Sequence, residues 1–406
     1  MVSEHRPFTL RPFRGLRFAP ETVGDLGTVV SPPYDVLDAE TVRDLEAANR
    51  RNIVRLILSR GFEQPYVAVR QRLHKWREKS YLRPDDEPAL YLYQYSVDGT
   101  TVRGLIGVAG LREESERVIL PHEEVMPGPV DDRTVLMRTT ATNLEPILLV
   151  HEGTSRLRGL ITDAAATSPL ADFVALDRSE HRLWAVTDVN ILDAIAAELS
   201  GTQALIADGH HRYAAYLRLQ AELRDPAAAA EASPWDYGLA LLVDQADHPL
   251  HIGPIHRSVG ALTMSDVQDV SADRADVFRS VPDREAGLAV LARRAEDPDG
   301  ASFVVTDGRS WAVLRTPRTN RIDAAVLHEV LLPAWGVADE QVGYHHSLDQ
   351  ALHTTARQPG IVVAVHPPNV ADVMAAAARG VRMPRKSTSF APKPRMGVVM
   401  RDLHDA

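Results

Sequence analysis

The sequence predicts an α/β protein with more than one structural unit, and three observations lead to this expectation. The chain has 406 residues, which exceeds the size of an ordinary single domain. Hydrophobic residues make up 45% of it and charged residues 25%, the balance of a folded globular protein. Short apolar runs that suit strands alternate with longer segments of helical periodicity. We expect three successive α/β units, over residues 1–118, 119–260 and 261–406.

Charge and composition exclude several classes of protein. The net charge of −10 argues against a general nucleic-acid binder, because phosphate neutralisation requires a basic surface. The chain has no cysteine, which excludes zinc–thiolate sites and leaves His, Asp and Glu as metal ligands. No apolar run approaches the ~18 residues that cross a bilayer, and no signal-type segment begins the chain. We expect a cytoplasmic protein without nucleic-acid or membrane partners, and the sequence leaves its oligomeric state open.

The first elements follow a proline turn. Two prolines exclude regular structure at Ser31–Asp35. Asp38 can then cap a helix over 39–49, and the apolar run 52–58 predicts a strand.

A helix and a hairpin complete the first unit. Helical periodicity covers 67–79. Three tyrosines alternate with other residues over 90–96, and Asp98-Gly99 supplies the turn into a second strand over 102–109.

The middle unit begins with a polar, proline-containing loop over 121–129. Asp131 or Asp132 can cap the next helix, and 146–150 then reads as a strand.

A strand, a tight turn and a helix follow. The strand covers 203–207, Asp208-Gly209 forms the turn, and the helix runs over 210–224. Residues 225–234 read as a helix end or surface loop, and 238–243 as another strand.

The sequence of the last unit predicts few individual elements. It contains a helix over 371–379 and a tail, 383–395, with too many prolines for a helix, which we interpret as a shaped loop. No internal repeat is visible.

The turn before the 210–224 helix carries the strongest chemical pattern. A helix N-terminus presents unpaired N–H groups and a partial positive charge, so this turn can bind an anion. Gly209 lets the backbone approach a phosphate, and Arg212 offers a planar fork of donors. Asp208 can hold a metal ion or orient a histidine. The alternative is that Asp208 is only a helix cap and the two histidines fill surface or core positions.

Two further segments combine chemically useful groups. Glu123, beside His122 and Glu124, can act as a general base, although adjacent glutamates on loops are commonly just solvated. The tail segment Arg385–Thr388 combines two cations with two hydroxyls, which suits a phosphate or carboxylate, but it lacks the glycines of a P-loop and can equally be a solvated basic tail.

At these residues the chain resembles a bacterial and archaeal family catalogued as domain of unknown function 1015. The matching blocks extend over nearly the whole chain: SPPYDV at 31–36, PHEE..PGP.DDR at 121–133, N.EPI at 143–147, HRLW at 181–184, IADGHHRY at 206–213, PIHR at 254–257 and MPRKSTSFAPK at 383–393. Two positions depart from the family pattern, Ile255 where a threonine is expected and Ala391 where an aromatic is usual.

The D-G-H-H-R segment is also similar to the phosphate-contacting segment of the ParB and sulfiredoxin-like fold and of free-serine kinases built on it. This resemblance implies a ParB/sulfiredoxin-like core elaborated by additional α/β units. The resemblance to family 1015, whose members look like neighbours of serine-biosynthesis enzymes, implies a phosphoserine-related role. By this likeness Asp208 and Glu123 would be the acidic catalytic pair and residues 209–212 a phosphate cradle.

From these patterns we expect a small-molecule phosphotransferase, a kinase of free serine or a related metabolite that uses ATP or ADP with Mg²⁺. Glu123 would take the hydroxyl proton, Asp208 would hold the metal or orient the acceptor, and Arg212 with Lys386 would neutralise the transferring group. Two alternatives stay open: hydrolysis of a phosphomonoester such as phosphoserine, and a nucleotide-binding regulator.

The expected site residues fall into three groups, and we expect their blocks to converge on one cleft. They are the catalytic Glu123, Asp208 and His210, the phosphate-binding or nucleotide-binding Gly209, His211, Arg212, Arg133, Lys386, Ser387 and Thr388, and the substrate-binding Tyr34, Asp35, His122, His181, Trp184, His256 and Arg257.

Overall fold

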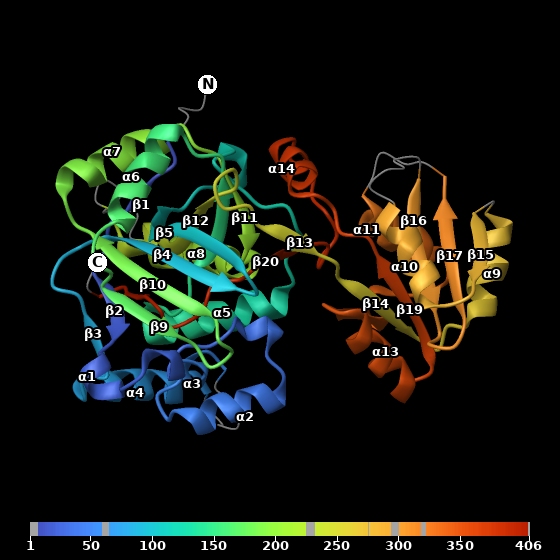
Figure 1. The fold of residues 1–406 in the computed structure, drawn as a ribbon, viewed down its shortest axis with the longest axis horizontal. Coiled ribbons are helices and arrows are strands. Elements are labelled where there is room, and N and C mark those ends of the chain that lie inside the picture. The colour runs from blue at the N-terminus through green and yellow to red at the C-terminus, as the bar shows by residue number, and fades with distance from the viewer. Residues whose placement is uncertain are drawn as a thin grey trace. The chain divides into compact units, whose positions relative to one another are not determined.

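Strands and helices alternate in the computed structural model, which confirms the expected α/β class (Figure 1). The structure describes residues 7–58, 65–224, 232–274, 276–293, 300–317 and 322–404. The chain forms two compact units, the first from residues 1–121, 125–250 and 392–406, the second from 122–124 and 251–391. This differs from the three successive units expected, because one sheet takes strands from both sides of residue 118 and the C-terminal segment returns to the first unit.

The first unit is built on a nine-stranded mixed sheet. Its strand order is β6-β11-β8-β12-β5-β4-β10-β9, with β1 paired to β5. The parallel pairs are β11 with β6 and β12 with β8. The strands are β1 (Leu10–Arg11), β4 (Leu90–Val97), β5 (Thr100–Gly110), β6 (Ile119–Leu120), β8 (Ile147–His151), β9 (Ala171–Val174), β10 (Glu180–Val186), β11 (Ala204–Asp208) and β12 (Tyr237–Asp244).

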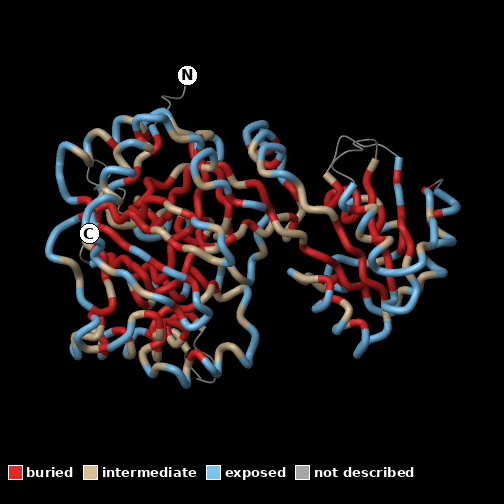
Figure 2. The backbone as a smooth tube through the Cα atoms, in the orientation of Figure 1, coloured by how far each residue is buried: buried red, intermediate tan, exposed pale blue. Residues whose placement is uncertain are grey.

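Three helices pack their apolar side chains onto one face of this sheet: α6 (Ser155–Ala165), α7 (Val189–Leu199) and α8 (His210–Leu223). Leu92 and Ile206 belong to the resulting core. Because strand side chains alternate between faces, Tyr91, Tyr93 and Tyr95 point the other way. All three are nevertheless buried, so both faces of β4 are covered (Figure 2).

A second core of the first unit lies around a four-stranded sheet of order β3-β2-β21-β7. Its strands are β2 (Gly15–Phe18), β3 (Leu82–Pro84), β7 (Thr142–Asn143) and β21 (Met400–Asp402). The helices beside it are α1 (Pro20–Val23), α2 (Ala39–Ala48), α3 (Val54–Ile57), α4 (Pro65–Glu78) and α5 (Pro127–Thr140). Since β21 lies near the C-terminus, the two ends of the chain meet in one sheet.

The second unit contains a six-stranded antiparallel sheet of order β15-β17-β16-β19-β14-β18 and a two-stranded pair, β13 with β20. The strands are β13 (His251–Gly253), β14 (His256–Gly260), β15 (Val277–Val281), β16 (Ala301–Thr306), β17 (Trp311–Thr316), β18 (Val342–His345), β19 (Gly360–Val365) and β20 (Ser389–Ala391). Its helices are α9 (Met264–Asp273), α10 (Arg284–Ala292), α11 (Asp323–Val326), α12 (Leu332–Ala334), α13 (Leu348–Arg357) and α14 (Val370–Ala378), with a π-helical turn at Leu327–Leu331.

Most of the expected elements are present within a residue or two. Asp38 caps α2 by accepting a hydrogen bond from the Thr41 amide, as expected. The hairpin of β4 and β5 turns at Asp98-Gly99, and both residues have positive φ. Part of the loop expected over 225–234, residues 225–231, lies outside the described residues. None of the described helices is long and apolar enough to span a bilayer.

Two expectations about elements were wrong. The strand expected at 52–58 is the helix α3, whose start is fixed by the buried Asn52 side chain, which accepts from the Val54 amide. Neither Asp131 nor Asp132 caps α5, because this helix already begins at Pro127, a residue that suits a first helical position.

Candidate active site

The junction between β11 and α8 positions Asp208 at a strand end. A β-bulge interrupts the pairing of β11 with β8 just before Asp208, and bulges of this kind turn a side chain to a new direction. Gly209 follows with φ of +98° and begins the helix. A side chain at Gly209 would lie 2.9 Å from Ile147 and 3.1 Å from the Arg212 guanidinium, so glycine is required for conformation and for space. Asp208 itself does not cap α8.

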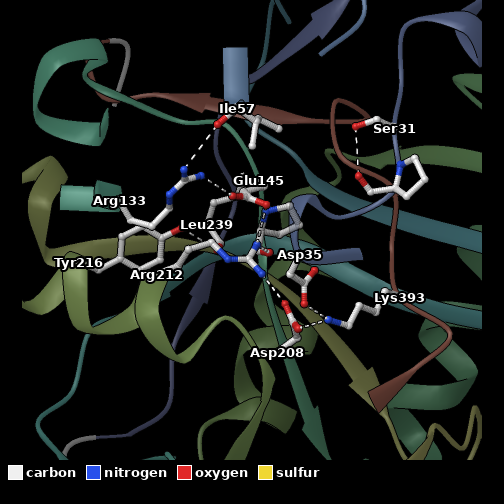
Figure 3. A network of polar contacts seen from close by, with 12 residues as sticks. Ser31, Asp35, Ile57, Arg133, Glu145, Asp208, Arg212, Tyr216, Leu239 and Lys393 are labelled. Carbon is white, nitrogen blue, oxygen red and sulfur yellow. Dashed lines mark hydrogen bonds and ion pairs between the residues drawn. The ribbon is translucent and has the colours of Figure 1, made fainter. Parts of the chain in front are cut away.

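Lys393 joins Asp208 to Asp35. Its Nζ lies 2.7 Å from Asp208 Oδ1 and 2.5 Å from Asp35 Oδ2, and Asp208 also accepts from Arg212 (Figure 3). These four residues come from η2 (Tyr34–Val36), β11, α8 and the segment before β21, all in the first unit. We call Asp35, Asp208, Arg212 and Lys393 the Asp208 centre.

Behind the Asp208 centre, a buried carboxylate lies between two arginines. Glu145 lies 3.3 Å from Arg212 and 3.5 Å from Arg133 (Figure 3). Arg133 also pairs with Asp132 and covers the Tyr34 ring, with its guanidinium carbon 4.7 Å from the ring centre. The ion pairs therefore continue without interruption from Lys393 to Asp132.

Charge and burial set the protonation of the Asp208 centre. Burial alone would raise the pKa of Asp208, but Lys393 and then Arg212 hold that pKa well below its usual range. Burial would lower the pKa of Lys393, but Asp208 and Asp35 raise it above the ordinary lysine value. Both groups therefore stay charged at neutral pH. Burial also raises the pKa of Tyr34 to about 12, so this phenol stays protonated.

Two buried polar atoms of the Asp208 centre have no hydrogen-bond partner within the described part of the chain. They are Asp35 Oδ1, an acceptor, and Arg212 Nε, a donor. Buried polar atoms are nearly always satisfied in native proteins, and an exception at a cluster of charges is a reason to expect a ligand.

A pocket of about 490 Å³, a volume typical of small-molecule sites, lies at Tyr34 and Arg133, and its lining includes none of the four residues of the Asp208 centre. Tyr34, Tyr66, Asp132 and Arg133 supply its polar lining, and the Tyr66 hydroxyl donates to Asp132. The remaining lining is mostly apolar and comes from α3, α4 and the start of α5: Leu56, Ile57, Leu58, Pro65, Val69, Gly128, Pro129 and Leu136. We call this the Tyr34 pocket.

Within the described residues, no three histidine or carboxylate side chains gather closely enough to hold a metal ion. Asp35 and Asp208 bring two carboxylates to one cation, and Asp35 Oδ1 lacks a partner. Mg²⁺ is commonly bound by one or two carboxylates together with substrate phosphates. Both oxygens of Asp208 are already paired with Lys393 and Arg212, so of the two aspartates it is Asp35, through Oδ1, that fits a magnesium ion arriving with a phosphate ligand.

The first unit also contains four further predicted residues, with different roles. His210 is buried and helps to lower the pKa of Asp208, and His211 Nε2 accepts from the Met126 amide at the start of α5. His181 and Trp184, expected to bind substrate, are buried in β10. His181 lies between Tyr93 and Ser179, burial lowers its pKa to about 4, and neither residue lines the Tyr34 pocket.

Glu123 belongs to the second unit, where its carboxylate is surrounded by donors. Oε1 accepts from the Thr388 amide and hydroxyl, each at 2.7 Å, and Oε2 accepts from the Lys386 amide at 3.2 Å. Burial raises the pKa of Glu123, and the bonds from Thr388 oppose this. Lys386 has φ of +58°, which turns its backbone toward Glu123. The loop expected to hold a phosphate thus holds a carboxylate of its own unit.

Four other predicted residues lie in the same unit and have polar partners there. His122 contacts the Thr388 hydroxyl, and Ser387 donates to the Pro384 carbonyl. His256 accepts from the Val365 amide. Arg257 is fully buried and donates to the Lys386 carbonyl and to His328. That these residues and those of the first unit build one site stays a prediction.

Two residues of the first unit were missed by the sequence reasoning. Lys393 ends the MPRKSTSFAPK block and lies between two prolines, and Glu145 lies in the N.EPI block just before β8. Both lay inside motifs already singled out. A charged residue directly before a buried strand, or fixed between prolines, was the available signal, but its partners are distant in sequence.

The chain is only distantly similar to proteins of known structure. No curated protein sequence matches the chain. Distant similarity exists to solved structures described as free serine kinase in complex with AMP (14% identity, 74% of this chain and 90% of that chain, TM-score 0.39), as a conserved hypothetical protein from Pyrococcus furiosus (14%, 74% and 96%, 0.38), and as SbnI with C-terminal truncation from Staphylococcus aureus (9%, 71% and 84%, 0.39).

A sequence family matches most of the chain. Residues 10–339 match the profile of the family described as protein of unknown function (DUF1015), and this range includes the Tyr34 pocket and all of the Asp208 centre except Lys393. The chain therefore belongs to the DUF1015 family.

Proposed function

We propose that the chain is a small-molecule phosphotransferase that moves a phosphoryl group from a nucleotide to the hydroxyl of free serine or a related amino acid. One observation carries the proposal. The Asp208 centre holds charged groups of both signs, with Arg212 buried and the other three residues half-buried, and among the described residues one acceptor, Asp35 Oδ1, and one donor, Arg212 Nε, have no partners. A ligand with both a hydroxyl and a phosphate can satisfy the two atoms.

Asp208 is suited to receive the proton in this reaction. As the substrate hydroxyl oxygen bonds to phosphorus, the bond from phosphorus to the bridging oxygen of the nucleotide breaks, and the nucleotide leaves with that electron pair. The hydroxyl proton passes to Asp208, which is ionised at neutral pH. A low pKa is tolerable in a base of this kind, because phosphoryl transfer depends mainly on positioning and charge stabilisation.

Lys393 and Asp35 have supporting roles. The Lys393 ammonium neutralises charge on the transferring group, and Asp35 keeps it beside Asp208. Asp35, through Oδ1, would hold Mg²⁺ brought by the nucleotide, and this ion would supply further neutralisation of the phosphates.

The Tyr34 pocket suits the acceptor. It offers a carboxylate, Asp132, next to a guanidinium, Arg133, in an otherwise mostly apolar lining. A free amino acid carries an ammonium and a carboxylate in the same close arrangement, so the two side chains can pair with its opposite charges. A chain of ion pairs connects Arg133 through Glu145 and Arg212 to Asp208. This connection supports a common function for the Tyr34 pocket and the Asp208 centre.

Glu123 stays a predicted base, but its geometry argues for a smaller role. Both of its oxygens already accept hydrogen bonds from residues 386–388. The oxygens of Asp208 also have partners, Lys393 and Arg212, but Asp208 lies beside Asp35 Oδ1 and Arg212 Nε, which lack partners among the described residues and favour a ligand there. For this reason we assign the proton transfer to Asp208.

The test uses the full chain with ATP or ADP, Mg²⁺ and a panel of hydroxyl amino acids that begins with L-serine. We expect a phosphorylated amino acid by ³¹P NMR that forms only when nucleotide and acceptor are both present. Absence of any nucleotide-dependent product over the whole panel would contradict the proposal. Release of phosphate from phosphoserine without nucleotide would replace it with the hydrolase alternative.

A further inference from the structure

We infer that the first unit contains a second anion site, apart from the Asp208 centre, which takes a small ligand with several phosphate groups. The site is a pocket of about 390 Å³ between α4 and the chain after α2. We call it the basic pocket. It is lined by Arg50, Arg51, Ala68, Gln71, Arg72, Lys75, Trp76 and Tyr81.

The charge of the basic pocket contrasts with that of the protein. Four of its eight lining residues are cationic, and none is acidic, although the chain has a net charge of −10. Arg50 and Arg51 come from one segment, Arg72 and Lys75 from another, so the cations converge from two parts of the chain. Like charges repel, and a cluster of this kind is favoured when an anion neutralises it.

Two of the arginines are held in place by hydrogen bonds to uncharged oxygens. Arg51 donates to the Tyr81 hydroxyl at 3.0 Å and lies over the Tyr81 ring, 4.1 Å from its centre. Arg72 donates to the Arg55 carbonyl at 2.6 Å. Fixed guanidinium groups lose little side-chain entropy when they bind phosphate, which makes them preorganised donors.

The electrostatic potential around the Tyr81 side chain is positive. The hydrogen bond from Arg51 and the charges of Lys79 and Lys75 lower the pKa of the Tyr81 phenol. Glu46 pairs with Arg55 at 3.6 Å and is not part of the pocket lining. Arg50, Arg51 and Lys75 therefore give the lining a positive potential.

The volume and the aromatic lining narrow the ligand class. A space of about 390 Å³ accommodates a nucleotide-sized molecule and is small for a macromolecular partner. Tyr81 is half-buried in this lining, so an aromatic surface accompanies the cations. The geometry favours a compact polyanion such as inorganic triphosphate or a nucleoside polyphosphate.

The basic pocket shares no lining residue with the Tyr34 pocket, although α4 contributes to both. Pro65, Tyr66 and Val69 line the Tyr34 pocket, and other α4 residues line the basic pocket. The inference therefore does not depend on the proposed activity, and binding can be measured without turnover.

The test is isothermal titration of the full chain with inorganic triphosphate, without nucleotide or added metal, at two salt concentrations. One variant combines Arg50→Glu and Lys75→Glu, two exposed positions where the fold tolerates change. The matched control is Arg70→Glu, which is exposed on the same helix and does not line the pocket. We expect wild type and control to bind one equivalent, more weakly at high salt, and the double variant to lose affinity by about tenfold or more.

Equal binding by the double variant and the control would overturn the inference. A neutral variant, Lys75→Gln, should lose less affinity for triphosphate than the double variant. Unchanged affinity in every variant would also overturn the inference. An oligonucleotide that binds more tightly than triphosphate, and loses affinity in the double variant, would replace the small ligand with a nucleic acid.

Discussion

The Asp208 centre of the first unit and the loop around Glu123 in the second are built from the same kinds of side chains. Each combines carboxylates, cations and backbone donors. They differ in how far their polar atoms are satisfied, because both oxygens of Glu123 have partners, whereas Asp35 Oδ1 and Arg212 Nε have none in the part of the chain that the structure describes. A satisfied buried carboxylate stabilises a fold, and an unsatisfied one leaves a place for a ligand.

The structure also gives Arg212 a different role from the one expected. Arg212 was expected to bind a phosphate with its fork of donors. In the structure it pairs with Asp208 and Glu145 and donates to the Pro146 carbonyl, so most of its donors serve the protein. We expect Lys393 to meet the phosphoryl group, with Arg212 as its buried support.

The largest effect should follow from Asp208→Asn. This change removes the proton acceptor of the proposed reaction, and turnover should fall by a factor of about 10² to 10⁴, with a smaller change in ligand affinity. The fold should survive, because Lys393 keeps Asp35 and Arg212 keeps Glu145 as partners. Turnover with saturating ATP and serine, together with thermal unfolding, checks both expectations.

Asp244→Asn is the matched control for Asp208→Asn. Asp244 is likewise an ion-paired aspartate at a strand end of the same sheet; it is buried and pairs with Arg158 at 2.6 Å. Loss of the Asp244 charge, and with it the ion pair to Arg158, should lower the free energy of unfolding and leave turnover per folded molecule nearly unchanged. Equal effects of the two variants on turnover would show that Asp208 acts only through structure.

The sequence predicted the class of fold and the position of Asp208, because both depend on local patterns. The strand, turn and helix around Gly209 are encoded within about twenty residues. The partners of Asp208 were not predictable, since Lys393 lies 185 residues further along the chain. The helix α3 was missed for a similar reason: its apolar residues are buried on several sides, which removes the periodicity that separates helix from strand.

Acidification should destabilise both units through buried histidines. Burial lowers the pKa of His151 and His181 in the first unit and of His256 in the second to about 4. Between pH 6.5 and pH 4 the unfolded chain binds more protons at these residues than the folded chain, so stability falls as the pH falls. Each of these three histidines should lower the free energy of unfolding by about 2 kcal/mol at pH 5 compared with pH 7.

Urea unfolding at pH 7 and pH 5 measures this loss. His181→Gln in the first unit and His256→Gln in the second should each reduce the difference between the two pH values. A pH dependence that neither variant changes would mean that these histidines are already charged in the folded protein.

A smaller effect should follow from Glu123→Gln. Its amide nitrogen cannot accept from the amides of Lys386 or Thr388, so one buried donor loses its partner. The free energy of unfolding should fall by about 1–3 kcal/mol, with turnover per folded molecule unchanged. A loss of turnover by orders of magnitude without a loss of stability would instead restore Glu123 as the base and reverse the comparison between the two units.

The smallest effect should follow from Tyr66→Phe, which removes one hydroxyl from the Tyr34 pocket. The Tyr66 hydroxyl donates to Asp132, and burial together with Asp132 raises the Tyr66 pKa to about 12, so the phenol stays a donor. Without it Asp132 is less firmly oriented toward an amino-acid ammonium, and the KM for the acceptor should rise by the equivalent of about 1 kcal/mol, with kcat nearly unchanged. Tyr81→Phe removes a hydroxyl from the basic pocket and should leave this KM as it is. If both substitutions raise the KM alike, the Tyr34 pocket is not the acceptor site, and the unpartnered atoms of the Asp208 centre need a ligand that enters from elsewhere.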